Sequence, residues 1–274
     1  MNVKSPSVNL LTLLRIYSRH YQLTWEMIKR DITDRYAGQM FGSAWAIGHP
    51  LLLMAIYTVV FSFIFSMKMG GQADFPLDYT TYLLSGLIPW LAFQESMTKG
   101  TTAILANADL VKQVVFPLEI LPVKGIFSSF LTQLVATLFL MCYVTIKFSF
   151  LPWTYSLLPL LFLFQIMAMA GVCFILAAVG AYFRDLKYIV QVLSIAILYG
   201  IPVFYLPNWL PNWFKPLFYL NPFSHMVWCY QDACYFGRFE HPWAWPVFFF
   251  MSFLVFSVGY RIFYKLKTMI GNFL

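Results

Sequence analysis

Six long apolar runs, separated by short polar segments, dominate this chain. A membrane-spanning helix needs about 20 mostly apolar residues, and each run is close to that length. The pattern predicts an all-α, polytopic membrane protein with six transmembrane helices, and an even number of spans puts both termini on one side. The runs cover residues 45–66, 79–98, 121–146, 156–182, 188–206 and 244–263.

The first 44 residues precede these runs and form a region of their own. Apolar side chains recur there at steps of three or four, which places them on one stripe of a helix. We expect an amphipathic helix along the cytoplasmic membrane interface, with its aromatic rings among the lipid headgroups. It acts either as a passive anchor or as a lever on the first span. The stripe consists of Leu10, Leu14, Tyr17, Tyr21, Trp25, Ile28, Ile32 and Tyr36.

A short helix is expected between the second and third spans, within residues 103–118. Asn107 or Asp109 can cap its start, and Pro117 ends it because the residue before a proline is pushed out of the helical region. The segment has more aliphatic side chains than a simple connector needs, and an apolar surface suits a groove on a partner protein. It is therefore a candidate coupling helix within a transmembrane domain that covers residues 45–274.

The segment after the fifth span is unusual because five prolines stand between Pro202 and Pro222, with aromatic residues among them. Proline removes a backbone donor and breaks regular helix, yet this segment is too apolar for bulk water. Broken helix at membrane depth is tolerated where protein covers it or where it lines a cavity. Residues 206–238 are therefore predicted to form a re-entrant lid, or outer gate, between spans five and six.

Composition and charge agree with a membrane protein and predict its orientation. Hydrophobic residues make up 61% of the chain and charged residues 11%, against roughly 25% charged residues in soluble domains. Fourteen of the 18 basic residues fall in segments on one side of the six spans, so the positive-inside rule places both termini in the cytoplasm. The same rule accounts for the net charge of +7 without a nucleic-acid partner.

Motifs for catalysis and nucleotide binding are absent from the sequence. It contains no Gly-Lys dipeptide and hence no phosphate-binding loop, and it has no residue set spaced for a metal or for nucleophilic catalysis. The spans hold no Asp, Lys or Arg near their centres, which disfavours a proton-driven carrier. Cys229 and Cys234 are close enough for a disulfide, but a pair of small buried thiols is the preferred interpretation. We expect no cofactor on this chain and an external source of energy.

Several short motifs occur in order along nearly the whole chain. They are Arg30-Asp31 with Arg35-Tyr36, Phe41-Gly42-Ser43-Ala44-Trp45, Leu84-Ser85-Gly86-Leu87-Ile88-Pro89-Trp90, Leu110-Val111-Lys112, Phe116-Pro117-Leu118-Glu119, Phe183-Arg184-Asp185, Pro202-Val203-Phe204-Tyr205 and Asn221-Pro222. Together they resemble the membrane permease of type-2 ABC exporters for polysaccharides, which move O-antigen, capsule and teichoic acid polymers. One departure stands after the last motif, where the family often has an arginine and this chain has Gln231-Asp232.

The resemblance implies a homodimer of six-span subunits that binds two copies of a separate ATPase subunit, which carries the ATP and Mg. Closure of the ATPase would act through the N-terminal helix and the coupling segment. A lipid-linked polysaccharide, with O-antigen favoured, would then move from the cytoplasmic to the outer face of the bacterial inner membrane. The alternatives are an ABC exporter of a small lipid or drug and a membrane-embedded glycan-assembly enzyme.

Four groups of candidate site residues follow from the motifs and the resemblance. Aromatic rings can stack on a sliding polymer without gripping one unit tightly, and the first and fifth spans line the pore in the family. The candidate channel lining is Tyr57, Phe61, Phe65, Tyr199, Phe204 and Tyr205. The candidate ATPase contacts are Asn107, Asp109, Leu110, Lys112, Phe116, Arg184 and Asp185. The candidate outer gate is Pro202, Pro207, Trp209, Trp213, Asn221 and Pro222, and the candidate headgroup contacts are Arg15, Arg19, Lys29 and Arg30.

Overall fold

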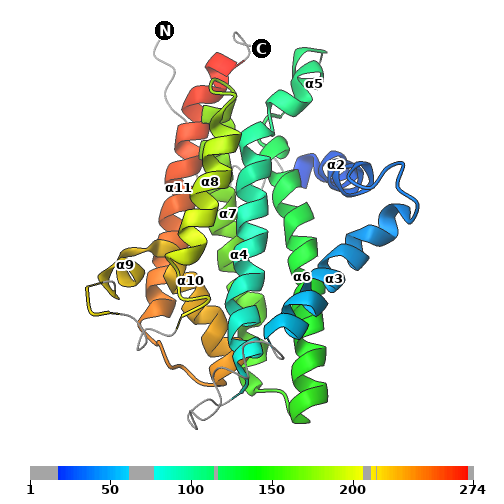
Figure 1. Ribbon diagram of the computed structural model, residues 1–274. Helices are drawn as coiled ribbons and strands as arrows, with labels where there is room; N and C mark the ends of the chain where they lie inside the picture. Colours follow the sequence, from blue (N-terminus) through cyan, green and yellow to red (C-terminus); the bar gives the residue numbers. More distant parts are fainter. Residues whose placement is uncertain (1–17, 62–76, 114–116, 206–210, 214, 271–274) are drawn as a thin grey trace.

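The computed structural model describes residues 18–61, 77–113, 117–205, 211–213 and 215–270, and every regular element in these ranges is a helix (Figure 1). The predicted all-α fold is confirmed for this part of the chain. The candidate residues Arg15, Phe65, Phe116, Pro207 and Trp209, and the side chain of Lys112, lie outside the described residues. In chain order the helices are α2 (Tyr21–Asp34), η1 (Gly42–Ala44), α3 (Trp45–Val59), α4 (Tyr79–Thr102), η3 (Leu105–Asn107), α5 (Ala108–Gln113), α6 (Ile120–Phe148), η4 (Trp153–Leu157), α7 (Leu158–Gly180), α8 (Leu186–Tyr199), α9 (Lys215–Leu220), α10 (Pro222–Gln231), η6 (Asp232–Phe236) and α11 (Ala244–Ile270).

Four helical stretches are long and apolar enough to cross a membrane. They correspond to the predicted first, third, fourth and sixth spans. The predicted second span also forms one helix, α4, but that helix is more polar because it includes five threonines. The predicted fifth span forms α8, a shorter apolar helix. The four long stretches are Gly42–Val59, Ile120–Phe148, Trp153–Gly180 and Ala244–Lys267.

α4 tolerates its polar side chains because it lies at the centre of the bundle (Figure 1). Every residue from Thr80 to Trp90 is buried, and α4 contacts α6, α7, α8 and α10. A helix covered by other helices does not need the apolar surface that a lipid-facing helix presents. The low hydropathy of α4 therefore reflects its central position.

α7 and α11 approach each other closely at two glycines. A Cβ atom on Gly259 would lie 2.1 Å from the carbonyl oxygen of Gly171, and a Cβ atom on Gly171 would lie 2.4 Å from the carbonyl oxygen of Val255. Small residues let helix backbones pack closely in a membrane, where association depends on such contacts. Glycine at these two positions thus sets the distance between α7 and α11.

α2 lies across the bundle instead of along it (Figure 1). It packs on α6, and Thr24 and Ile28 are its buried residues. Tyr21 and Trp25 are 65% and 57% exposed. The predicted apolar stripe is therefore divided between a part that packs on protein and a part that is free to meet lipid headgroups.

The predicted fifth span, residues 188–206, is wrong at its C-terminal end. α8 ends at Tyr199. Pro202 lacks a backbone donor and disfavours helical backbone at the residue before it, Ile201, so the helix cannot continue to residue 206. After this break the chain returns through α9 to α10, which begins at Pro222.

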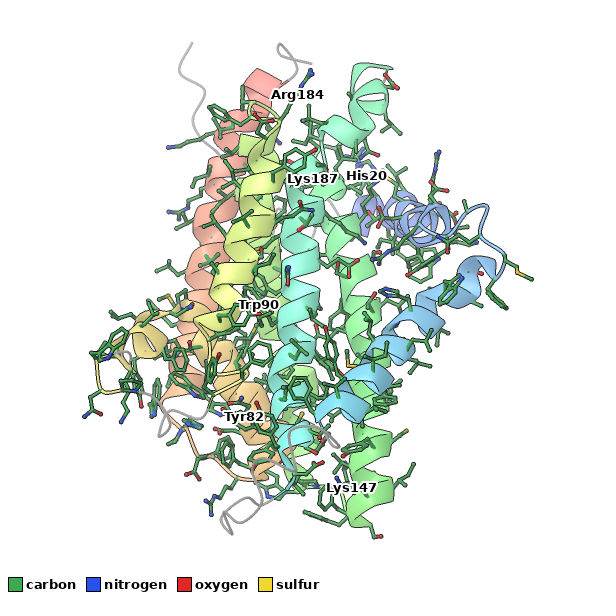
Figure 2. The ribbon with its side chains drawn as sticks, in the orientation of Figure 1. His20, Tyr82, Trp90, Lys147, Arg184 and Lys187 are labelled. Atoms are coloured by element: carbon green, nitrogen blue, oxygen red, sulfur yellow. The ribbon has the colours of Figure 1, made fainter. Side chains whose placement is uncertain are left out.

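The two ends of the bundle are named here after elements that lie at them. The α5 end holds α5, the turn between α7 and α8, and the C-terminal end of α11. The η4 end holds η4, the C-terminal end of α6, and the connection from η6 to α11 (Figure 1). Figure 2 shows Arg184 and Lys187 at the α5 end and Lys147 at the η4 end, in keeping with the predicted sorting of basic residues.

Candidate functional site

Five charged side chains link α2, α4 and α6 near the α5 end. Arg35, just after α2, lies 2.6 Å from an oxygen of Glu95 on α4. Lys99, one turn further along α4, lies 3.2 Å from that same oxygen and 3.2 Å from an oxygen of Asp31. Lys124 on α6 approaches the other Asp31 oxygen at 3.9 Å. These side chains are 17% to 36% exposed, so the network is only partly shielded from water and responds to salt.

The charged network extends to the predicted coupling segment through Lys124. Lys124 Nζ donates to the side-chain oxygen of Asn107 at 3.0 Å, and the Asn107 side-chain nitrogen donates to the carbonyl of Ala103 at 2.7 Å. Asn107 is the last residue of η3 and stands directly before α5. Its side chain therefore connects α5 to the bundle, a role that the sequence pattern does not reveal.

The other described candidates for ATPase contacts lie at the same end. Arg184 and Asp185 occupy the exposed turn between α7 and α8, and Asp109 is exposed near the start of α5. Leu110, also on α5, is half-buried. This end of the bundle therefore exposes charged side chains near the start of α5 and in the turn between α7 and α8.

The basic residues around α2 differ in what they contact. Arg19, Lys29 and Arg30 are exposed, and Arg30 pairs with Asp34 on its own helix at 3.1 Å. Arg35 instead reaches across to α4. The sequence placed the first three among the headgroup candidates, whereas the contact of Arg35 depends on a helix 60 residues further along the chain.

The break after α8 leaves backbone carbonyls that side chains from α4 and α10 bind. Tyr82 Oη donates to the carbonyl of Pro202 at 3.1 Å, and Gln231 Nε2 donates to the same carbonyl at 2.6 Å. Tyr79 Oη donates to the carbonyl of Phe204 at 2.7 Å. Lipid offers no donors, so broken backbone at membrane depth needs protein partners of this kind. The three donors are electrically neutral.

Asn221 of the Asn-Pro motif bonds to the backbone on both sides of the break, at the end of α8 and at the start of α10. The side-chain oxygen of Asn221 accepts from the backbone N–H of Phe223 at 3.1 Å and caps α10, while its nitrogen donates to the carbonyl of Gly200 at 3.2 Å. Pro222 follows at the first helical turn, where its missing N–H is not needed. One side chain thus joins the end of α8 to the start of α10. Trp213, another gate candidate, is 78% exposed.

A buried carboxylate holds the connection between η6 and α11. Asp232 is 1% exposed and accepts from the backbone N–H of His241 at 3.0 Å and from Trp245 Nε1 at 3.1 Å. Its other oxygen lies 2.9 Å from His241 Nδ1. The Gln231-Asp232 pair, where the chain departs from the family pattern, thus serves two structural purposes: Gln231 binds the break and Asp232 binds the start of α11.

The candidate channel aromatics meet near the start of α4. Tyr199 stacks on Phe204 with ring centroids 5.6 Å apart. Phe61, just after α3, lies 6.1 Å from the ring of Tyr79, whose hydroxyl binds the Phe204 carbonyl. Aromatic residues from the first and fifth predicted spans are therefore joined through α4. Of the candidates, Tyr57, Phe61 and Phe204 are half-buried, and Tyr199 and Tyr205 are exposed.

Asp78 caps α4 at the η4 end. It accepts from the backbone N–H of Thr81 at 3.2 Å, and one of its oxygens lies 2.6 Å from both Lys147 Nζ and Tyr143 Oη. Burial by itself raises the pKa of this carboxyl, but the hydrogen bonds and the Lys147 charge outweigh burial and lower the pKa below its usual value. Asp78 is therefore a charged contact between α4 and α6 at the η4 end.

The cysteines carry no visible redox chemistry. All four are free, and Cys229 and Cys234 are both buried, which confirms the interpretation of this pair as buried thiols. In the part of the chain that the structure describes, no group of three or more His, Cys, Asp or Glu side chains is placed to hold a metal ion.

The helices that carry these contacts lie within a region that matches a known protein family. A model of the ABC-2 type transporter family matches residues 22–235. The chain belongs to the ABC-2 type transporter family. The matched range runs from α2 to η6, so this ABC-2 transporter chain has its ion network, its α5 segment and its break after α8 inside the family domain.

Curated relatives match between 72% and 90% of this ABC-2 chain. It is 28% identical over 249 residues to the O-antigen export system permease protein RfbA of Klebsiella pneumoniae, covering 90% of this chain and 93% of that protein. It is 29% identical over 197 residues to RfbA of Myxococcus xanthus, with 72% and 73% covered. It is 25% identical over 207 residues to the polysialic acid transport protein KpsM of Escherichia coli, with 74% and 78% covered.

Proposed function

We propose that this chain is the channel-forming permease of an ATP-driven exporter that moves a lipid-linked polysaccharide, O-antigen in the favoured case, across the bacterial inner membrane. The observation that carries the proposal is the match to an O-antigen export permease over nine-tenths of the chain. ATP hydrolysis belongs to a separate ATPase subunit, because the sequence holds no phosphate-binding loop. The chain itself is a non-catalytic membrane subunit.

The proposed subunit has six spans with the α5 end and both termini in the cytoplasm. α4 and α8 add two proposed spans to the four long apolar stretches, which makes six. The 14 residues of α8 extend only about 21 Å at 1.5 Å per residue, less than the roughly 30 Å of a hydrocarbon core. The chain beyond the break therefore completes the crossing, and residues 206–238 form the outer gate.

Coupling is proposed to start at the α5 end. Two ATPase subunits dock on α5, on the exposed turn with Arg184 and Asp185, and on α2. The ion pairs that join α2 to α4 and α6 support a path by which movement of α2 reaches the centre of the bundle. Asn107 connects α5 to the same network.

A homodimer is proposed to enclose the channel. α3 and α8 each carry apolar side chains that are more than half exposed in the single subunit, and two copies can place these faces around a shared axis. The exposed side chains are Leu52, Ile56 and Val59 on α3 and Ile189, Val192 and Ile195 on α8.

The test is reconstitution of the chain in proteoliposomes with its ATPase subunit and a lipid-linked glycan. We expect glycan to reach the opposite leaflet only with ATP and an active ATPase, and a hydrolysis-deficient ATPase is the matched control. Translocation that proceeds without ATP hydrolysis would refute the proposal. Covalent extension of the glycan by the chain alone would favour a glycan-assembly enzyme instead.

The outer gate has its own test. We expect that replacing Trp209 and Trp213 together with alanine leaves dimer assembly intact but alters export or leak, because the two indoles belong to the segment that covers the exit. Assembly is measured by size-exclusion chromatography with light scattering, and leak by dye release from proteoliposomes. Unchanged export together with unchanged leak would make this segment an interface anchor.

A further inference from the structure

A cavity lies between α3, α4, α6 and α8 in the half of the bundle nearer the α5 end. Its volume is about 350 Å³, at the lower end of the roughly 300–1,000 Å³ found for small-molecule sites. It is too small for a polymer and fits a compact headgroup. Arg35 and Glu95 of the charged network belong to its lining.

The lining of the cavity changes from polar to apolar along α4. Gln94, Glu95 and Thr98 line the part nearer the α5 end, and Ile88 and Leu91 line the part nearer the middle of the bundle. A headgroup with an attached hydrocarbon has the same order of polarity. Along α4 the cavity is therefore matched to an amphipathic molecule that enters with its polar part at the α5 end, whereas α6 lines it with Thr132, Gln133 and Ala136.

The residues of α3 that line the cavity also change from polar to apolar away from the α5 end. His49, near the start of α3, lines the cavity at the α5 end, and Leu53 and Met54 line it one turn deeper. Two helices that are far apart in the sequence thus present the same gradient to one space. This order on α3 and α4 fits a single amphipathic ligand.

Several polar groups of the lining remain available for a ligand. The side-chain amides of Gln94 and Gln191 form no hydrogen bond with the described part of the chain, and both side chains are only half-buried. Arg35 donates one N–H to Glu95 at 2.6 Å, out of the five that a guanidinium carries. Gln133 differs, since its amide is engaged with other buried side chains.

Arg35 and Glu95 both line the cavity, and the charged network behind them adds Asp31, Lys99 and Lys124. Arg35, Lys99 and Lys124 face two carboxylates, so the linked network holds more positive than negative groups. A guanidinium matches phosphate oxygens in bidentate geometry. Amide side chains, which donate and accept, match sugar hydroxyls or acetamido groups.

We propose that this cavity binds the phosphorylated sugar headgroup of a lipid-linked glycan before translocation. The phosphate lies at Arg35, the first sugar is hydrogen-bonded by Gln94 and Gln191, and the first lipid carbons lie along Leu53 and Leu91. This inference rests on the proposed function and names its substrate-entry site. Arg35 is a different arginine from those that the sequence put forward for headgroup contact.

The test measures binding of a synthetic farnesyl pyrophosphoryl-N-acetylglucosamine to the full chain in nanodiscs. Gln191→Leu, Gln94→Leu and Arg35→Gln are each expected to raise Kd on the order of tenfold, as expected for loss of a hydrogen bond to a charged or buried group. Arg238→Gln is the matched control, because it also removes an arginine–glutamate pair (2.8 Å) but at the η4 end. Should Gln94→Leu fail to fold, Gln191→Leu on the less buried α8 retains the test.

Three results would overturn the inference. Kd values that do not differ among the variants would show that the cavity does not hold the probe. Equal affinity for farnesyl pyrophosphate would show that the sugar is not recognised, and equal affinity for free N-acetylglucosamine 1-phosphate would assign the site to a soluble ligand. In each case ATP-driven export by the unmodified chain would leave the proposed function standing, whereas absence of that export would refute the function itself.

Discussion

Two regions of this bundle, the charged network near the α5 end and the break after α8, are held together by different chemistry. Near the α5 end, α2, α4 and α6 meet through ion pairs between partly exposed side chains. Beyond α8, neutral donors bind backbone carbonyls, and the buried Asp232 binds the start of α11. Water and salt can replace a lost partner at the first site, but a buried carbonyl or carboxylate has no such substitute. The two regions should therefore respond differently to salt and to loss of a partner.

The largest expected effect concerns Asp232. Asp232→Ala leaves the N–H groups of His241 and Trp245 without their acceptor, and loss of one partner of a buried charged site costs about 3 kcal/mol. We expect this loss in the free energy of unfolding, measured by denaturation in detergent. Glu240→Ala, an exposed carboxylate nearby, is expected to cost less than about 0.5 kcal/mol. Equal losses for the two variants would show that burial of Asp232 adds nothing to its contribution.

A smaller effect is expected at the break itself. Tyr82→Phe removes the hydroxyl that binds the Pro202 carbonyl, and an unsatisfied buried acceptor costs about 1–2 kcal/mol. Thermal unfolding at low and high salt should show the same loss, because the contact is neutral. Tyr188→Phe, at an exposed position, serves as the control and should leave the unfolding temperature unchanged. A loss of stability that becomes smaller at high salt would show that the contact between Tyr82 and the Pro202 carbonyl is not a purely neutral hydrogen bond.

The stability that the charged network contributes should depend on salt, unlike that of the break. Lys99→Met removes the links to Asp31 and Glu95, and partly exposed ion pairs contribute about 1 kcal/mol or less. We expect the loss in unfolding free energy to shrink at high salt, while ATP hydrolysis by the partner becomes less coupled to export. Lys187→Met, on α8 at the same end, is the control. Salt-independent destabilisation would show that Lys99 acts through packing.

The smallest effect is a pH dependence at Asp78. Its pKa is lowered in the folded chain, so its stabilising contribution is complete above the unfolded pKa of about 4 and is lost as pH falls through the folded value. The difference in unfolding temperature between the unmodified chain and Asp78→Asn should therefore stay constant near neutral pH and narrow as the pH falls below about 4. A difference that widens toward low pH would mean that Asp78 is not held as a carboxylate by Lys147.

The hydrophobic runs predicted the helices well because helix formation in a membrane protein depends mainly on local composition. The second and third predicted spans begin within one residue of α4 and α6, and the sixth begins where α11 begins. The end of the fifth was missed, although Pro202 was visible, because apolar residues continue to Tyr205. Where a polar environment is absent, hydropathy alone does not locate a break.

The sequence by itself determined the fold class, the membrane setting and the family, since these depend on composition and on short motifs read in order. Only the tertiary structure decided which polar groups meet: Asp31 with Lys99, Gln231 with the Pro202 carbonyl, and Asp232 with His241. These partners are separated in the chain or hidden in apolar runs, and their pairing follows from how α2, α4 and α10 pack. The cavity that Arg35 shares with Gln94 and Gln191 arises in the same way, because no local pattern specifies a space lined by residues from four helices.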